Sequence, residues 1–265
     1  MRASESPSAF ARDGIAVRHD GPLAVVELDL PQPKNSFRAG NAQALSAALD
    51  SALADGARAV LLRGAGPVFC AGWDVASIQP GDVDPLAVIA EVVGPLLRQL
   101  RELPVPTVAE VAGPALGFGF GLALCCDIVV AAEEALMGSP FRNLGMVPDS
   151  GTHHHLLSRL GLGLAIELIY TGRLLKGSEA AALRLVNRAL PAADLPAEAR
   201  RLAEDIAHGP TRAFALSKRV LLQGGDFDAM VAHEGRQLQQ AFATADLREG
   251  IAAFQQRRKP QFQGR

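Results

Sequence analysis

The stretch GPALGFGFGLALCCD, residues 113–127, decides the fold of this chain and bears most directly on its chemistry. Gly113, Gly117, Gly119 and Gly121 permit backbone conformations and close approaches that a Cβ atom would block. We interpret the stretch as the end of a strand, a glycine-rich turn and a buried helix. The first N–H groups of such a helix are unpaired, and the positive end of its dipole lies beside them. The turn is therefore suited to binding a developing oxyanion.

Outward from this stretch, strands and helices alternate through the first half of the sequence. Apolar patterns predict strands over 23–30, 57–64, 106–113 and 127–133. They predict helices between these strands over 41–55, 86–103 and 117–126. Such alternation is typical of parallel strands joined by helical crossovers. After about residue 150 the strand signal nearly vanishes, and the patterns predict helices over 151–160, 163–171, 178–185, 194–208, 211–223, 227–243 and 246–257.

Short polar motifs mark the ends of several predicted helices. Ser178, Asp194 and Asp226 are candidate N-caps, because their side chains can accept hydrogen bonds from the first helical N–H groups. Asp246 with Glu249 forms an acidic version of a capping box. The segment 78–85, rich in glycine and proline, predicts a mobile surface loop.

Composition limits the classes of protein to which the chain can belong. Its 265 residues are 49% hydrophobic and 20% charged, with a formal net charge of −2. Because the longest basic run is only Arg257 to Lys259, nucleic acid is not an expected partner. The sequence contains no apolar run of signal-peptide or membrane-spanning length, so we expect a cytoplasmic protein without a membrane partner. The cysteines (Cys70, Cys125 and Cys126) lack metal-binding spacing and are expected to be buried free thiols.

Another glycine turn, GPVFCAGWD at 66–74, comes earlier in the chain and directly follows the predicted strand 57–64. Gly72 allows a sharp reversal there, so that the N–H of Trp73 points out of the sheet. Taken alone this turn is weak support for a site, because strand–glycine–turn segments are common. Its value comes from its combination with the glycine-rich turn in residues 113–127.

Together the two turns identify a resemblance to the enoyl-CoA hydratase/isomerase (crotonase) superfamily. The resemblance covers nearly the whole chain and rests on the Asn35 segment, FCAGWD at 69–74, PTVAEVAGPALGFGFGLALCCD at 106–127, PFRNLGMVPDSGT at 140–152, TGRLLKGSEAAALRLVNRAL at 171–190 and ADLREGIAAFQQRRKPQF at 245–262. It implies an α/β fold with a spiral core of ββα turns. The acyl-CoA-binding core would occupy residues 1–190, and a helical C-terminal region at 191–265 would pack in a homotrimer or a dimer of trimers.

The resemblance also implies the positions of the binding site. The backbone N–H groups of Trp73 and Phe118 would form an oxyanion hole for an acyl-CoA thioester. Phe118 replaces the middle glycine of the family's usual GGG, so its ring is expected to narrow the pocket. The substrate pocket would include Phe120, Gly121, Phe141 and Met146, although the aromatic residues among them are equally suited to filling the core. Coenzyme A would contact Lys34, Ala71, Gly72, Asp74 and Lys259, the last of which reaches CoA phosphates across subunits in some relatives but is otherwise a solvated lysine.

The catalytic acids depart from those of the hydratases. The two glutamates that hydratases of this family use correspond to Gly121 and Phe141, and neither residue can transfer a proton. One acid remains nearby, Asp149 in LGMVPDSGT, at a position that resembles the single carboxylate of the Δ3,Δ2-enoyl-CoA isomerases and the phenylacetate-pathway ring-opening isomerases. The segment is similar to carnitinyl-CoA dehydratases too, but those keep the glutamates. An alternative role for Asp149 is that of N-cap to the following helix.

Three functions are therefore open from the sequence. The first is an enoyl-CoA double-bond isomerase that uses Asp149 as its base, without a metal or a cofactor other than the CoA thioester substrate. The second is a hydratase, dehydratase or hydrolase that acts on CoA thioesters with Asp149 and water. The third is a non-catalytic acyl-CoA-binding homologue. An apolar setting around Asp149, provided by Leu144, Met146 and Val147, is expected to raise the pKa of its carboxyl group.

Overall fold

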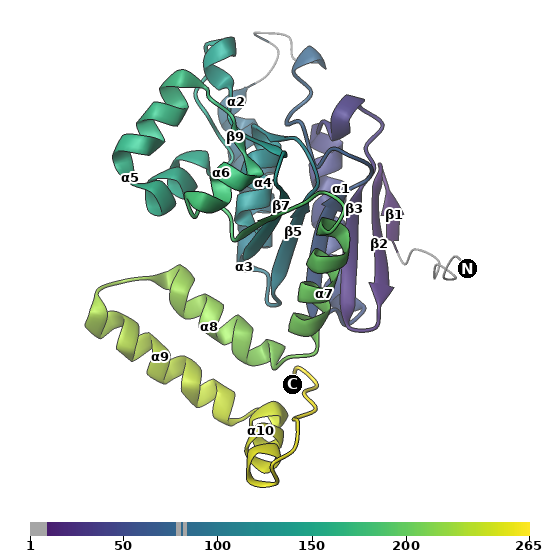
Figure 1. Ribbon diagram of the computed structural model, residues 1–265, viewed down its shortest axis with the longest axis vertical. Helices are drawn as coiled ribbons and strands as arrows, with labels where there is room; N and C mark the ends of the chain where they lie inside the picture. The colour runs from purple at the N-terminus through teal and green to yellow at the C-terminus, as the bar shows by residue number, and fades with distance from the viewer. Residues whose placement is uncertain (1–9, 78–80, 82–83) are drawn as a thin grey trace.

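The computed structural model describes residues 10–77, 81 and 84–265, so most of the loop predicted over 78–85 lies outside the described residues (Figure 1). Its centre is a seven-stranded sheet in the order β1-β2-β3-β4-β5-β7-β10. β3 and the strands after it in that order pair in parallel, whereas β2 is antiparallel to both neighbours. The strands of this sheet are β1 (Phe10–Arg12), β2 (Ile15–Asp20), β3 (Leu23–Leu28), β4 (Ala59–Gly64), β5 (Thr107–Val111), β7 (Ile128–Ala132) and β10 (Arg188–Leu190). A smaller sheet contains β6 (Ala115–Leu116), β8 (Leu136–Gly138) and β9 (Leu175–Lys176).

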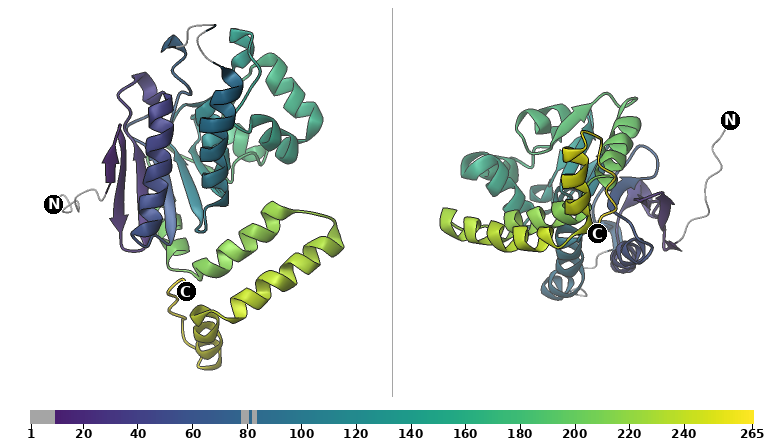
Figure 2. Two further views of the ribbon diagram at one scale, coloured as in Figure 1. Left: turned by 180° about the vertical axis from the view of Figure 1, so that it is seen from behind. Right: turned by 90° about the horizontal axis from the view of Figure 1, so that it is seen from below.

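Helices cover both faces of the large sheet. α1 (Ala39–Ala54) and α3 (Gly94–Glu102) lie on one face, and α7 (Leu195–Ala207) lies on the other (Figures 1 and 2). The hairpin of α8 (Thr211–Gln223) and α9 (Phe227–Phe242), followed by α10 (Ala245–Gln255), extends beyond the sheet. The remaining elements are η1 (Pro33–Asn35), η2 (Val75–Ser77), α2 (Pro85–Ala87), the π-helical turn η3 (Val88–Val93), α4 (Phe118–Cys125), η4 (Phe141–Leu144), α5 (Thr152–Thr171) and α6 (Gly177–Ala182).

Apolar patterning explains the core layers. On α1, Ala42, Leu45, Ala48, Leu49 and Ala52 recur at helical spacing, and all are buried against the sheet. Burying each leucine side chain fully contributes about 1.5–3 kcal/mol. The predicted mixed α/β fold, with its strands in the first half and helices at the C-terminal end, is confirmed.

One part of the second half differs from the sequence-based prediction. β9 and β10 are strands in the region where the strand signal nearly vanishes. They have two and three residues, which is too short to leave an alternating pattern. The helices predicted over 151–160 and 163–171 are confirmed as the two helical segments of α5, which are separated by a kink at Gly161, where φ is 76° and ψ is 169°.

The predicted helix caps had mixed outcomes. Asp226 is confirmed as the N-cap of α9, since its Oδ1 accepts a hydrogen bond from Ala229 N at 2.9 Å. Asp194 occupies the N-cap position of α7 without a side-chain cap bond. Ser178 is not the N-cap of α6, because that helix begins earlier, after Lys176.

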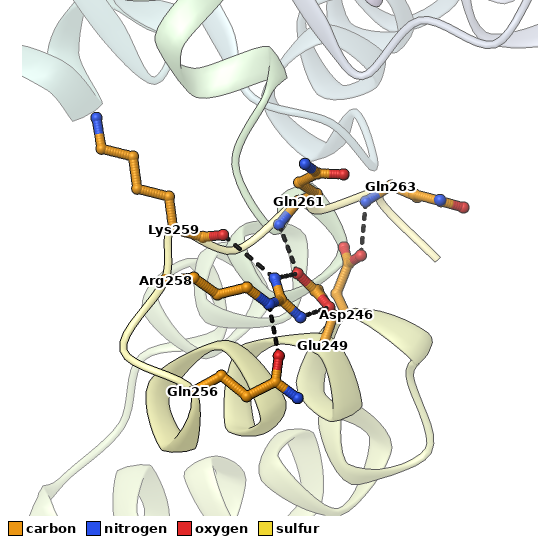
Figure 3. Close-up of polar contacts among 7 residues, drawn as sticks. All are labelled: Asp246, Glu249, Gln256, Arg258, Lys259, Gln261 and Gln263. Atoms are coloured by element: carbon orange, nitrogen blue, oxygen red, sulfur yellow. Dashed lines mark hydrogen bonds and ion pairs between the residues drawn. The ribbon is translucent and has the colours of Figure 1, made fainter.

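The capping box predicted for Asp246 and Glu249 is wrong, because both carboxylates bind the C-terminal tail instead (Figure 3). Thr244 caps α10, and its Oγ1 accepts a hydrogen bond from Leu247 N at 3.1 Å. Asp246 is buried and accepts hydrogen bonds from the N–H groups of residues 263 and 264, each at 2.7 Å. Glu249 pairs with Arg258 at 2.6 Å, and this contact holds the pKa of Glu249 down at about 2.

Arg58 attaches the same tail to the large sheet. Its guanidinium group donates to the carbonyl oxygen of Phe262 at 3.1 Å and to that of Gly209 at 2.7 Å. Arg58 immediately precedes β4, so the tail lies at the amino end of that strand. The predicted domain boundary between residues 1–190 and 191–265 falls at the end of β10. The division into two domains stays a prediction. Beyond this boundary, α7 packs on β4 and β5 of the large sheet. Within the part of the chain that the structure describes, no helix has the length and apolar character needed to cross a bilayer.

We expect Asp246→Ala to lower the free energy of unfolding by about 1–3 kcal/mol, because two N–H groups of the tail lose a charged acceptor that is itself buried. Denaturant unfolding followed by circular dichroism measures the change. Asp228→Ala on the exposed first turn of α9 is the matched control and should change stability by less than about 0.5 kcal/mol. Equal stabilities for the two variants would contradict a structural role for Asp246.

Candidate active site

The glycine turn at 66–74, the first of the two in the chain, lies after the carboxyl end of β4. Gly72 has a φ of 102°, a conformation that favours glycine. Phe37 bridges this turn in parallel: its N–H donates to Gly72 O at 2.8 Å, and its carbonyl oxygen accepts from Asp74 N at 2.9 Å. In a parallel bridge the residue between these two bonds directs its own N–H to the opposite side. The N–H of Trp73 therefore points away from Phe37.

The second glycine turn meets the first. Gly117 has a φ of 53° and is the N-cap of α4, so Phe118 supplies the first helical N–H. A Cβ atom on Gly72 would lie 2.8 Å from Leu116 O and 3.7 Å from Phe118 N. Among the described residues, neither Trp73 N nor Phe118 N has a backbone acceptor. The structure thus places two unpaired N–H groups on adjoining turns, one of them at a helix N-terminus.

The ring of Phe118 turns inward. It packs between Phe37, with ring centroids 4.8 Å apart, and Trp73, with centroids 5.6 Å apart, and Phe118 is only 2% exposed. The expectation that this ring narrows the pocket is wrong, because the ring fills the core beneath the turn. Phe120 is buried as well, whereas Trp73 and Phe141 are half-buried.

Two glycines let α4 contact the loops on both of its sides. A Cβ atom on Gly119 would lie 2.7 Å from the Cβ of Cys70 and closer still to its carbonyl oxygen. A Cβ atom on Gly121 would lie 2.6 Å from the Cβ of Ser150 and closer still to its carbonyl oxygen. Real Cβ atoms do not approach other atoms so closely, so only glycine fits at either position. α4 therefore contacts the turn at 66–74 through Cys70 and the Asp149 turn through Ser150.

Asp149 is a half-buried carboxylate on the turn that contacts α4. Gly121, which touches Ser150, is three residues after Phe118 and thus about 4.5 Å along the helix axis. Burial raises the pKa of Asp149 above its ordinary value, while a hydrogen bond from Ser150 Oγ to its Oδ1 at 2.7 Å opposes the rise. A half-buried carboxyl group with a raised pKa is a stronger base than an exposed aspartate.

The alternative role of Asp149 as an N-cap is wrong. The N-cap of α5 is Gly151, and both Ser150 and Gly151 have positive φ, at 56° and 75°. This left-handed turn separates Asp149 from the helix. Asp149 contacts the start of α5 through its backbone oxygen, which accepts a hydrogen bond from Thr152 N at 3.0 Å.

The other predicted pocket residues lie on the loop that includes η4. A Cβ atom on Gly117 would lie 3.0 Å from Cε1 of Phe141, so the Phe141 ring lies against the residue before Phe118. Met146 is 46% exposed, and its N–H donates to the Phe141 carbonyl oxygen at 3.1 Å. An apolar ring therefore lies at the position that the resemblance assigns to the second glutamate of the hydratases.

The predicted CoA-binding residues fall into two groups. Lys34 lies beside the first turn, because its carbonyl oxygen accepts from Ala71 N at 3.0 Å. Asp74 on the same turn is paired with Arg38 at 2.6 Å. Lys259 belongs to the tail that Arg58 holds at the opposite end of β4, and its side chain extends away from the tail's polar cluster (Figure 3). Since β4 has six residues and rises about 3.3 Å per residue, Lys259 does not join the site of its own chain.

At the far end of α4 a buried thiol lies beside a buried imidazole of α5. Cys125 Sγ lies 3.5 Å from His155 Nε2; burial is the main reason why the pKa of His155 falls to about 3 and that of Cys125 rises to about 11. Both groups are therefore neutral, unlike a catalytic thiolate and imidazolium. All of the cysteines are free and buried, which confirms that prediction.

Sequence reasoning missed Ser150 and the packing role of Gly119. Ser150 is 95% buried in a left-handed conformation that a serine seldom adopts, and nothing in the letters PDSG indicates this. A usable signal was the joint occurrence of Gly121 and the PDSG motif, since a glycine in a helix often marks a close backbone approach.

Comparisons with known proteins agree with this geometry. A model of the enoyl-CoA hydratase/isomerase family matches residues 18–265. The chain is 35% identical over 245 residues to a probable enoyl-CoA hydratase of Rhodobacter capsulatus, covering 92% of this chain and 95% of that one. It is 33% identical over 279 residues to the mitochondrial methylglutaconyl-CoA hydratase of Rattus norvegicus, covering 99% and 87%. The crystal structure of an enoyl-CoA hydratase from Bacillus anthracis superposes with a TM-score of 0.87 at 30% identity, covering 95% of this chain and 100% of that one. The chain therefore belongs to the enoyl-CoA hydratase/isomerase family and has the crotonase fold.

Proposed function

We propose that this protein is an enoyl-CoA double-bond isomerase in which Asp149 is the single base. The thioester oxygen would lie between the N–H groups of Trp73 and Phe118. Asp149 would remove a proton from C2 of a 3-enoyl-CoA, and the electron pair would delocalise onto the thioester oxygen. The protonated Asp149 would then return the proton to C4, which moves the double bond from C3–C4 to C2–C3. The proton leaves and returns through one carboxyl group, so no water or redox partner is consumed.

The unpaired N–H groups support the first half of this mechanism. Preorganised donors stabilise the enolate oxygen more than the ground-state carbonyl, and each is worth about 10²–10³ in rate. Phe118 N is at the N-terminus of α4, where the helix dipole adds to the effect. The contact between the two turns keeps both donors on one side of the site.

The contact between Gly121 and Ser150 is the observation that favours an isomerase over a hydratase. Syn-hydration in this family uses a pair of glutamates, and the positions of that pair are Gly121 and Phe141. A side chain at position 121 would collide with the backbone of Ser150, so the Asp149 turn occupies the space of the first glutamate. The Phe141 ring covers Gly117 in place of the second. One half-buried carboxylate with a raised pKa fits a proton shuttle and offers no second group to activate water.

A hydratase or dehydratase remains the second candidate, because relatives that share about a third of their residues with this chain bear hydratase names. The substrate is an acyl-CoA in either case, as membership of the family implies. For the CoA moiety we propose contacts with Lys34, Ala71, Gly72 and Asp74. Lys259 would serve the site of a neighbouring copy, since it cannot reach its own.

We also propose that the protein is a homotrimer or a dimer of trimers. Large apolar side chains on the C-terminal helices are exposed in the single chain, among them Phe227 at 81% and Phe254 at 86%. Exposed apolar surface of this kind is typical of an interface between subunits. The helices α8, α9 and α10 extend beyond the sheet and so present these side chains to a neighbour (Figure 2).

A substrate panel separates the candidate functions. We expect purified protein to convert 3-enoyl-CoA thioesters to the 2-enoyl isomers, measured by absorbance of the conjugated product and by chromatography. Hydration of 2-enoyl-CoA should be slower by at least about 10², because the second proton-transfer group is missing. Faster hydration than isomerisation would establish the hydratase instead. Tight CoA-thioester binding without any turnover would establish the non-catalytic homologue.

A further inference from the structure

Ser150 is the residue that joins Asp149 to α4. It is 5% exposed, and its Oγ donates to Asp149 Oδ1 at 2.7 Å. Its carbonyl oxygen and Cβ lie against Gly121 so closely that no side chain could be added there. The side chain of Ser150 therefore holds the carboxylate, while its backbone is fixed on the helix that begins at Phe118.

The conformation of Ser150 adds a second observation. Its φ of 56° lies in the left-handed region, which costs a residue other than glycine about 1 kcal/mol or more. Glycine follows at position 151 with the same handedness, so glycine would have been the less strained choice at 150 as well. A serine held in a strained and buried conformation points to a use for its hydroxyl group.

We infer that Ser150 is a positioning residue that fixes one oxygen of Asp149 against α4, so that the other oxygen faces the substrate. Among the described residues, Oδ2 accepts no side-chain hydrogen bond. The inference rests on the proposed role of Asp149 as base. A fixed carboxylate can reach two carbons of one acyl chain without searching through rotamers, which is the advantage that orientation gives a catalytic group.

Removal of the Ser150 hydroxyl group should change the pKa of Asp149 in a predictable direction. The hydrogen bond from Ser150 stabilises the charged carboxylate and lowers the pKa of Asp149 against the effect of burial. Without it, the pKa of Asp149 rises. Since the base must be unprotonated, the acid limb of the kcat profile moves to higher pH. At neutral pH kcat falls by about 10- to 100-fold because the carboxylate is no longer held in one orientation.

Two substitutions separate the hydroxyl group from the backbone. Ser150→Ala removes the hydroxyl and keeps the strain, whereas Ser150→Gly removes the hydroxyl and relieves the strain. We expect both variants to show the same lowered kcat and shifted acid limb, with KM changed by less than about threefold, because the contacts to CoA are untouched. Ser158→Ala on α5, where the hydroxyl donates to the His155 carbonyl oxygen at 3.3 Å, is the matched control and should behave as the wild type.

A direct titration keeps the test independent of turnover. Carbon-13 NMR of aspartate carboxyl groups, with the Asp149 signal assigned by its loss in Asp149→Asn, should show a higher Asp149 pKa in both Ser150 variants than in the wild type. An unchanged titration in both variants, or recovery of wild-type kcat in Ser150→Gly alone, overturns the inference. If the wild type converts no enoyl-CoA, the proposed function fails, and the titration alone decides the role of Ser150.

Discussion

Asp149→Asn should lower the kcat for isomerisation by at least about 10², because the variant keeps the shape of the side chain and loses the base. Asparagine can still accept the hydrogen bond from Ser150 Oγ, so the turn should retain its geometry. KM should change little, since the N–H groups of Trp73 and Phe118 remain in place. Steady-state kinetics with a 3-enoyl-CoA, with circular dichroism to confirm folding, measures the effect.

The pH dependence provides an internal check on this variant. Activity of the wild type should rise with pH through the pKa of Asp149, and burial places that pKa above the ordinary range of an aspartate. The residual activity of Asp149→Asn should lack this acid limb. Asp205→Asn on the exposed surface of α7 is the matched control and should have wild-type kinetics. Isomerisation at the wild-type rate in Asp149→Asn would exclude Asp149 as the base.

Gly121→Glu should abolish isomerisation without creating a hydratase. The glutamate would have to displace the backbone of Ser150, since even a Cβ atom at this position lies 2.6 Å from the serine Cβ. We expect the free energy of unfolding to fall by about 1–3 kcal/mol from overpacking. kcat should fall at least about 100-fold because the Asp149 turn is displaced. Thermal unfolding and the substrate panel measure both effects.

The control for this variant is Gly163→Glu. Gly163 also lies within a helix, α5, but a Cβ atom there would meet nothing within 4 Å. The glutamate should therefore leave stability and kcat within experimental error of the wild type, apart from a small gain in helix propensity. If Gly121→Glu were as stable and active as Gly163→Glu, the contact with Ser150 would not limit the site.

The sequence was sufficient to predict the elements that carry strong local patterns. α1 and β4 were predicted within two residues of their observed ends, because apolar periodicity and flanking turns define them. The two glycine turns were predicted from their glycines, whereas their pairing around one site was implied by the family resemblance; the structure brings Gly72 and Phe118 together as expected. Short strands such as β10 were missed, since they exist only by pairing with a strand distant in the sequence.

Features that depend on tertiary contacts could not be predicted from local patterns. The strained turn at Ser150 depends on its contact with Gly121, which is 29 residues earlier in the sequence. Asp246 was predicted to cap a helix because it precedes a helical pattern, but the folded tail offers its carboxylate better donors. The inward packing of Phe118 likewise depends on Phe37 and Trp73, which come from separate segments.

The close contact between Gly121 and Ser150 also determines which substitutions this protein can acquire during evolution. A lineage that needed a carboxylate at position 121 could not acquire it in one step, because the glutamate and the present Asp149 turn exclude each other. The loop would have to change first, and that intermediate would have lost its base before it gained another. The two segments are thus epistatic, and directed evolution toward hydration should succeed only in libraries that vary position 121 together with residues 148–151.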